Sequence, residues 1–109
     1  MDKQKLRGAR EWIQSELKKS IDFWLKNGMD EVNGGVYTCL DRRGEIYSTD
    51  KSVWMQGRCA WTFSYLCRVY GKKQEWLDAA KSCLDFLEEH CINRTAGDRL
   101  YFTVTAGGK

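Results

Sequence analysis

Residues 51–67, KSVWMQGRCAWTFSYLC, decide the fold of this chain, because they predict a helix that is apolar or aromatic on nearly every side. One arginine, Arg58, stands among aromatic residues: Trp54 precedes it by four residues, and Trp61 and Tyr65 follow it by three and seven. On a helix these positions share one face. An unpaired guanidinium is costly to bury and stays charged near neutral pH. We therefore expect Arg58 either to pair with a carboxylate or to face a cavity that holds a polar ligand.

Two further helices are predicted on either side of this buried helix, which we place at residues 52–70. Apolar residues recur at helical spacing from residue 3 to residue 27, and Asn27-Gly28 is typical of a helix end. Residues 74–91 predict an amphipathic helix that lies outside the buried one. Its apolar stripe is expected to contain Trp76, Ala80, Leu84, Leu87 and Cys91.

Short β-hairpins are predicted between the helices. Residues 34–49, GGVYTCLDRRGEIYST, hold two short strands around an Asp-Arg-Arg-Gly turn. Residues 99–109, RLYFTVTAGGK, predict a strand that enters a second glycine-bearing turn and has no return partner in this chain. The two regions align weakly at an offset of 65 residues, starting from Val36 and Tyr101. This pattern predicts a repeated unit of hairpin, buried helix and amphipathic helix, which needs neighbours on both sides, and so a chain that is part of a longer array.

The composition argues against several classes of protein. The 109 residues are 42% hydrophobic, which is enough for one small domain with a core. Basic and acidic residues alternate at a net charge of +3, so we expect neither a nucleic acid nor a membrane as partner. The polar N-terminus shows no signal peptide, which predicts a cytoplasmic protein.

The five cysteines form no Cys-x-x-Cys pair. We expect free thiols that fill the core in a reducing compartment, rather than ligands of a metal. The sequence also contains no phosphate-binding loop and no serine nucleophile motif, so no cofactor is expected.

NGGVYTCLDRRG (residues 33–44) and KSVWMQGR (residues 51–58) are the most specific pieces of the sequence. They resemble the N-terminal part of the N-acylglucosamine 2-epimerase family, and the resemblance extends over essentially the whole chain. Residues 54–58, WMQGR, are more similar to the N-acylglucosamine branch than to the cellobiose 2-epimerase branch. The resemblance implies an all-α fold, the (α/α)6 barrel with short β-hairpins between its helices. Residues 1–109 would form roughly the first quarter of that barrel.

The resemblance also implies a reaction, the epimerisation of an open-chain sugar at C2, with N-acylglucosamine and N-acylmannosamine as the expected pair. A base removes the proton next to the C1 carbonyl, an acid returns one on the opposite face, and the enediolate between them needs a fixed donor. Arg58 matches the family's active-site arginine and would be both catalytic and substrate-binding. Trp54 matches an aromatic residue that lines the sugar pocket. The family's two catalytic histidines lie on later helices, and His90 matches neither of them.

Several alternatives stay open on the sequence. An aldose–ketose isomerase on the same scaffold would reprotonate the same enediolate at C1. A truncated, non-catalytic binding or structural module is the alternative from another class, because the sequence ends before the two histidines, and we expect the chain alone to be inactive. Gln56 is expected to hydrogen-bond either a substrate hydroxyl or a buried backbone group. The exact sugar, activation by a nucleotide and the choice between a monomer and a homodimer are also open.

Overall fold

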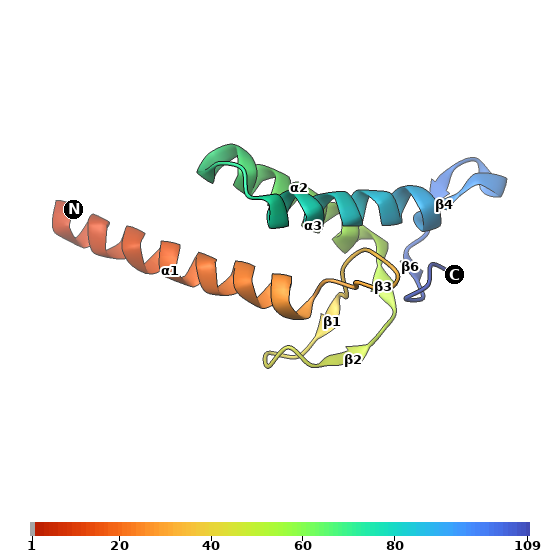
Figure 1. Cartoon of the computed structure of the whole chain (residues 1–109), viewed down its shortest axis with the longest axis horizontal. Coiled ribbons are helices and arrows are strands. Elements are labelled where there is room, and N and C mark those ends of the chain that lie inside the picture. Colours follow the sequence, from red (N-terminus) through yellow and green to blue (C-terminus); the bar gives the residue numbers. More distant parts are fainter. Residues whose placement is uncertain (1) are drawn as a thin grey trace.

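The computed structural model describes residues 2–109 and is built mainly from three helices (Figure 1). They are α1 (Lys3–Asn27), α2 (Val53–Tyr70) and α3 (Gln74–Phe86), and a five-residue π-helix, η1 (Leu87–Cys91), continues α3. Each predicted range agrees with the structure to within one residue, once η1 is counted with α3. The helical spacing of apolar residues is therefore a sufficient signal for all three helices.

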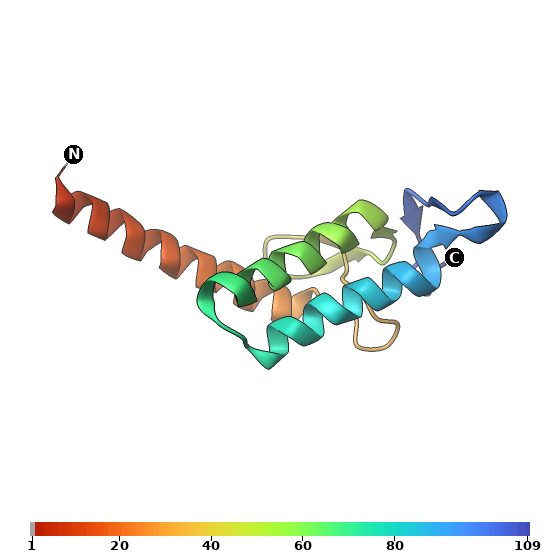
Figure 2. The same cartoon turned by 90° about the horizontal axis from the view of Figure 1, so that it is seen from above.

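The helices form an antiparallel pair and one projecting arm (Figures 1 and 2). α2 and α3 run side by side in opposite directions, and the last turns of α1 lie against them, whereas the first turns of α1 extend beyond the pair. The molecule is accordingly elongated, with extents of 58 × 28 × 26 Å. Leu6, Trp12 and Ile13 on the projecting half of α1 are exposed.

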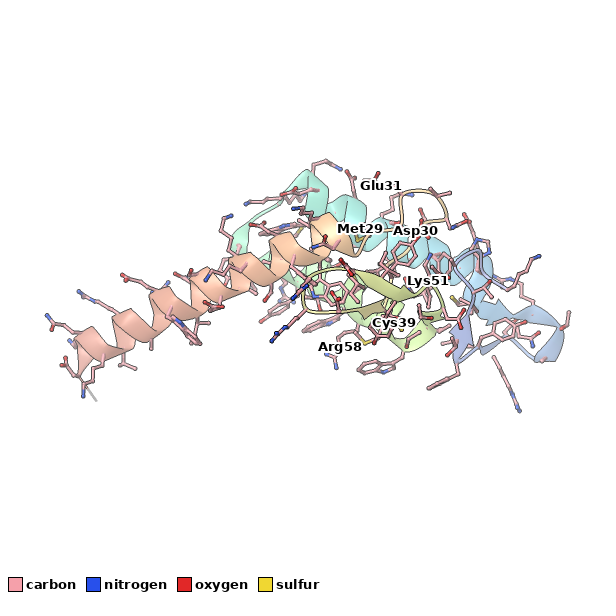
Figure 3. All side chains as sticks on the ribbon, turned by 90° about the horizontal axis from the view of Figure 1, so that it is seen from below. Met29, Asp30, Glu31, Cys39, Lys51 and Arg58 are labelled. Atoms are coloured by element: carbon pink, nitrogen blue, oxygen red, sulfur yellow. The ribbon has the colours of Figure 1, made fainter. Side chains whose placement is uncertain are left out.

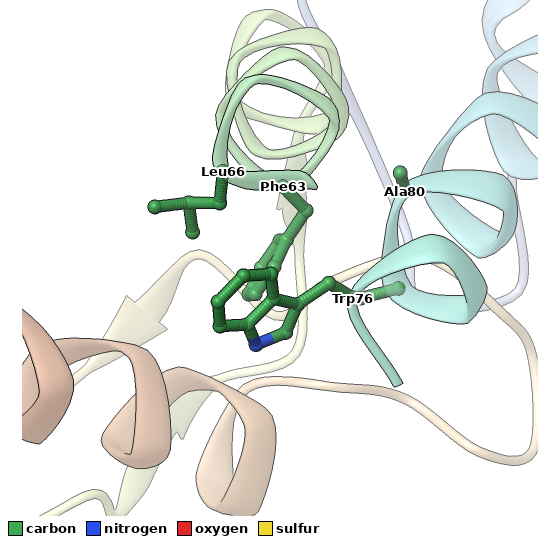
Figure 4. Packing of buried hydrophobic residues seen from close by; sticks show 5 residues of the cluster. Phe63, Leu66, Trp76 and Ala80 are labelled. Atoms are coloured by element: carbon green, nitrogen blue, oxygen red, sulfur yellow. The ribbon is translucent and has the colours of Figure 1, made fainter. Parts of the chain in front are cut away.

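The largest core cluster lies where α2 and α3 meet (Figure 4). Phe63 and Leu66 from α2 pack against Trp76, Ala79 and Ala80 from α3. The side of this cluster that faces α1 is covered by Leu17, Ile21 and Leu25. Burying one large apolar side chain contributes about 1.5–3 kcal/mol, so this cluster is the main apolar contribution that holds the helix pair together.

The expectation that α2 is buried nearly all round is wrong. Trp54 is 64% exposed and Trp61 is 58% exposed, and Tyr65 and Val69 on the same side of the helix are about half exposed. α3 covers one side of α2 and the end of α1 covers another, so the third side stays open. The composition of the helix predicts how much apolar surface it carries, but not how many neighbours are present to cover it.

The apolar stripe of α3 also differs from the prediction, because Leu84 is exposed. The inward positions are Trp76, Ala79, Ala80, Cys83 and Phe86. The π-helix η1 then adds one residue to the turn, which rotates the following positions. Cys91 is therefore fully buried in the last turn.

Between residues 2 and 109, six short strands form three antiparallel pairs. The strands are β1 (Cys39–Leu40), β2 (Ile46–Ser48), β3 (Lys51–Ser52), β4 (Ile92–Asn93), β5 (Arg99–Leu100) and β6 (Thr103–Val104), with a short 3-10 turn η2 (Arg94–Ala96) between β4 and β5. β1 pairs with β2 as the predicted hairpin. β3 pairs with β6, and β4 pairs with β5. The expectation that the last strand has no return partner is therefore wrong, since the C-terminal segment folds back onto the start of α2 (Figure 1).

The weak repeat in the sequence corresponds to two turns with the same hydrogen bonds, at residues 41–45 and 105–109. In each turn the first residue donates its N–H to the carbonyl of the fifth residue, at 2.9 and 3.0 Å. The fourth residue, Gly44 or Gly108, donates to the carbonyl of the first and has a φ of 92° or 87°. The side chain of the first residue, Asp41 or Thr105, accepts from the N–H of the fifth. The offset is 64 residues, one fewer than the predicted 65.

Candidate functional site

Arg58 lies on the open side of α2. The side chain is exposed, so its charge is not buried, contrary to the expectation from its aromatic neighbours. Its guanidinium carbon lies 5.0 Å from the centre of the Trp54 ring, one helical turn before it. Among residues 2–109 no carboxylate is within ion-pair distance of it. The described residues therefore provide no ion-pair partner for Arg58.

Two cavities meet at Arg58. The first, of about 270 Å³, lies between α1 and α2 and is almost entirely apolar; Tyr37 and Thr38, from the loop before β1, are among its few polar residues. The second, of about 550 Å³, lies between α2 and the segment that joins β5 to β6. Arg58 lines both cavities. It is the one cation that either cavity receives from the described part of the chain.

The second cavity has the character of a ligand site. Trp54 and Trp61 from α2 face Tyr101 and Phe102 from the C-terminal segment across it. Trp61 is held flat against Tyr65, with ring centres 5.0 Å apart and an interplanar angle of 8°. Small-molecule sites typically combine aromatic walls with a few fixed polar groups. A guanidinium over the Trp54 face supplies several hydrogen-bond donors in a planar array, which suits an oxygen-rich ligand.

Gln56 has a structural role, which decides between its two predicted partners. It is fully buried, its side-chain carbonyl accepts from the Val36 N–H at 2.9 Å, and its amide donates to the Val36 carbonyl at 2.7 Å. The Gln56 side chain therefore bonds both backbone groups of Val36, as a neighbouring strand would. It fixes the loop that carries Tyr37 and Thr38 to the first cavity.

Lys51 and Asp30 form a buried ion pair that the sequence analysis did not predict. The ammonium of Lys51, in β3, is fully buried and lies 2.6 Å from the carboxylate of Asp30, which is 3% exposed (Figure 3). It also donates to the carbonyls of Gly34 and Ala106, at 2.8 and 3.0 Å. All three N–H groups of the ammonium thus have acceptors. One side chain joins the loop after α1, the start of α2 and the C-terminal turn.

Aromatic rings complete the surroundings of the Lys51 ammonium. It lies 4.4 Å from the centre of the Phe86 ring and 5.0 Å from that of Tyr37. Burial raises the pKa of Tyr37, and the nearby charge of Asp30 raises it further. Tyr37 therefore stays protonated at this site.

Asp30 is held ionised in spite of its burial. Burial acts to raise the pKa of this carboxyl group, but it is outweighed by the Asn33 N–H, the Lys51 ammonium, the Val32 N–H and the Asn33 side chain, which all donate to the carboxylate. Together they lower the pKa of Asp30 from its ordinary 3.8 to about 2. The pair is consequently charged at neutral pH.

The single histidine lies away from both cavities. His90 is in η1, where its ring packs on Phe86 with centres 5.0 Å apart and where Gly108 comes close to it. Its Nε2 lies 3.6 Å from a carboxylate oxygen of Glu89. The structure thus places His90 in η1, the last turn of the helix, and not beside Arg58.

Val36, Gln56 and Arg58, which form or support this site, all lie in a range that matches a known family. Residues 35–109 match the model of the family described as N-acylglucosamine 2-epimerase (GlcNAc 2-epimerase). The chain belongs to this family. The matched range includes the hairpin, α2, α3 and the C-terminal turn, and so it contains Trp54 and Arg58.

N-acylglucosamine 2-epimerases and cellobiose 2-epimerases are similar to this chain over nearly its whole length. The N-acylglucosamine 2-epimerase of Homo sapiens is 32% identical over 110 residues, which covers 99% of this chain and 26% of that protein. The cellobiose 2-epimerase of Ruminococcus albus is 34% identical over 99 residues, covering 89% of this chain and 25% of that protein. The chain therefore spans about a quarter of the length of these relatives.

Solved structures agree with this assignment. The cellobiose 2-epimerase of Spirochaeta thermophila superposes with a TM-score of 0.76 at 27% identity, over 95% of this chain and 26% of that one. A sugar epimerase from a ruminal bacterium superposes with a TM-score of 0.71 at 33% identity, over 82% and 22% of the two chains. The chain thus has the helical architecture, with small hairpins, of sugar epimerases. Within residues 2–109 no helix combines the length and apolar character that crossing a membrane requires.

Proposed function

We propose that this chain forms roughly the first quarter of an (α/α)6 barrel and supplies part of the active site of a sugar 2-epimerase. The observation that carries the proposal is the position of Arg58, exposed between two cavities and held over the Trp54 ring. In such a barrel α2 would be an inner helix and α3 an outer one. The open side of α2, which is rich in aromatic residues, would then face the interior of the barrel.

The proposed substrate is an open-chain N-acylated hexosamine, with N-acylglucosamine and N-acylmannosamine as the two epimers. Removal of the proton at C2 moves negative charge onto the C1 oxygen and forms an enediolate. Arg58 donates hydrogen bonds to that oxygen, and these bonds strengthen as the charge develops. Trp54 holds the guanidinium from below and provides a flat wall for the sugar.

The acid and base of this reaction lie outside the two cavities as this chain forms them. His90 packs on Phe86 instead, and the described residues that line the two cavities include no histidine and no carboxylate. We therefore propose that residues 1–109 alone bind sugar weakly and do not epimerise it. The two histidines that the family resemblance places on later helices would complete the site.

The test is a chimaera in which these 109 residues replace the aligned segment of the human relative. N-acetylglucosamine is incubated in D₂O with the chimaera or with the isolated chain, and proton NMR follows the loss of the C2 proton. The chimaera should exchange this proton and produce the C2 epimer, and the isolated chain should not. A ketose product would support the isomerase alternative instead. A folded chimaera without exchange, or an isolated chain that exchanges, would contradict the proposal.

A further inference from the structure

Two of the five cysteines meet across the interface of α2 and α3. Cys83 of α3 is fully buried in a cluster with Val36 and Ala60, and Cys59 of α2 packs against this cluster. Cys59 and Cys83 thus belong to one packing cluster, although they come from two different helices. Small residues at this part of the interface, Ala60 and Ala79 among them, let the two helices approach closely. A disulfide needs Cα atoms about 4.4–6.8 Å apart, a range that only helices in such close contact offer.

The two thiols have different environments. The interaction with Cys83 lowers the pKa of Cys59, although its partial burial acts in the opposite direction. The interaction with Cys59, together with burial, raises the pKa of Cys83. Because Cys59 is only partly buried and Cys83 is fully buried, Cys59 is the member of the pair that more readily forms a thiolate, the reactive form of cysteine.

Cys59 is also the member that a small molecule can reach. It is partly exposed and lines the first cavity, the hollow of about 270 Å³ between α1 and α2, next to Arg58. Cys83 has no exposed surface. An oxidant that enters the cavity can therefore reach Cys59, whereas Cys83, in the cluster against which Cys59 packs, does not line the cavity.

We propose that Cys59 and Cys83 are a peroxide-sensitive thiol pair, in which Cys59 is oxidised and Cys83 then closes a disulfide between α2 and α3. This inference goes beyond the sugar chemistry and does not depend on it. It replaces, for this pair alone, the expectation that the cysteines only fill the core.

The proposed reaction has two steps. In the first, the Cys59 thiolate attacks one oxygen of hydrogen peroxide, so that an S–O bond forms, the O–O bond breaks and hydroxide leaves, taking up a proton to become water. In the second, the Cys83 sulfur attacks the sulfur of the Cys59 sulfenic acid. The S–S bond forms, the S–O bond breaks, and the departing hydroxide takes the proton of Cys83 to give a second water. The two thiols lose two electrons and two protons, and one peroxide is reduced to two waters.

The other three cysteines provide internal controls. Cys67 lies near the end of α2, two turns after Cys59, with its sulfur 4.0 Å from the Lys73 carbonyl. Cys39 lies in β1, and Cys91 is fully buried, where burial raises its pKa. A reaction governed by exposure alone would oxidise Cys39 and Cys67 along with Cys59, since all three are partly exposed.

The experiment treats the 109-residue chain with graded hydrogen peroxide, then titrates free thiols and maps disulfides by mass spectrometry of a non-reduced digest. We expect the number of free thiols to fall from five to three, with one disulfide that joins Cys59 to Cys83 and is reversed by dithiothreitol. Cys67→Ala should form the same disulfide. Cys83→Ala should form none, and its Cys59 sulfenic acid should be trapped by dimedone.

A second condition keeps the test independent of how well the variants fold. When the wild-type chain is unfolded in urea before oxidation, the pairing between Cys59 and Cys83 should give way to a mixture of pairs. Persistence of this pair as the main product in urea would overturn the proposal, because the fold would not be its cause. So would a disulfide between another pair in the folded chain, or oxidation of Cys39 and Cys67 while Cys59 and Cys83 stay reduced.

Discussion

Breaking the buried ion pair between Lys51 and Asp30 should destabilise the chain far more than breaking an exposed pair of the same length. Both Lys51–Asp30 and Lys81–Asp85 have a nitrogen–oxygen distance of 2.6 Å. The side chains of the first pair are 0% and 1% exposed, whereas those of the second are 75% and 54% exposed. The two pairs thus differ in burial and not in length, which makes the second a matched control for the first.

The expected magnitude follows from this difference. Removing one partner of a buried pair leaves an uncompensated charge and costs about 3–5 kcal/mol. An exposed pair is worth about 0–1 kcal/mol. Asp30→Asn should therefore cost several kcal/mol, and Asp85→Asn at most about one. For a domain of this size about 4–8 °C of melting temperature corresponds to each kcal/mol, so Asp30→Asn should lower it by more than about 12 °C.

The same pair gives the stability a specific dependence on pH. The pKa of Asp30 is about 2 in the folded chain against an ordinary 3.8. At about 1.36 kcal/mol per pKa unit, this lowered pKa contributes about 2.4 kcal/mol to the free energy of unfolding. The contribution is fully present above the unfolded pKa of 3.8 and is lost as the pH falls to and below the folded pKa of about 2. Asp30→Asn should remove this part of the acid dependence.

Urea unfolding followed by tryptophan fluorescence at pH 7, 4 and 2.5 measures both effects. Lys51→Met and the double variant Lys51→Met, Asp30→Leu extend the series. The double variant should be more stable than Lys51→Met, because it leaves no unpaired carboxylate. The reasoning is refuted if Asp30→Asn and Asp85→Asn lose the same free energy of unfolding, or if Asp30→Asn keeps the acid dependence of the wild-type chain.

Three other predictions concern the site and the open face of α2. In the chimaera with the human relative, Arg58→Ala should lower kcat by about 10²–10³ and Arg58→Lys by less, with little change in melting temperature because the side chain is exposed; a large loss of stability with near-normal kcat would contradict the catalytic role. Gln56→Leu should cost about 1–3 kcal/mol for each peptide group of Val36 that loses its partner, whereas Gln74→Leu, whose hydrogen bond to Asp78 is exposed, should be nearly neutral in urea unfolding. The isolated chain should self-associate through the exposed aromatic side of α2, and Trp61→Lys should shift light scattering toward the monomer; a wild-type chain that is monomeric and unfolds cooperatively would argue for a self-contained fold.

The helices were predictable from the sequence because their signals are local. Apolar spacing and the ends at Gly28 and Gly71 lie within each segment, and α1, α2 and α3 begin and end where these signals place them. The pairing of β3 with β6 has no comparable signal. Each strand has only two residues, and the partners lie about 50 residues apart. Such short strands form because the chain around them is already placed.

The candidate site was predictable in part. The spacing of Trp54 and Arg58 correctly indicated that they share a face. It could not indicate that this face is open, since exposure depends on which segments lie next to the helix. Lys51 was missed for a different reason. A lysine between Asp50 and Ser52 is expected at a surface, and its partner Asp30 lies 21 residues earlier in a loop.

The contacts of Lys51 also bear on the order in which the chain can fold during its synthesis. The carbonyl of Ala106, one of the three acceptors of its ammonium, lies 55 residues later in the chain. On a ribosome that adds about 5–20 residues per second, Lys51 is therefore made several seconds before the last of its three acceptors exists. During that interval the ammonium keeps part of its water, and the loop after α1 lacks the link to the C-terminal turn that Lys51 provides. Final locking of this loop must wait for the C-terminal turn, so the two segments become rigid together in a late event.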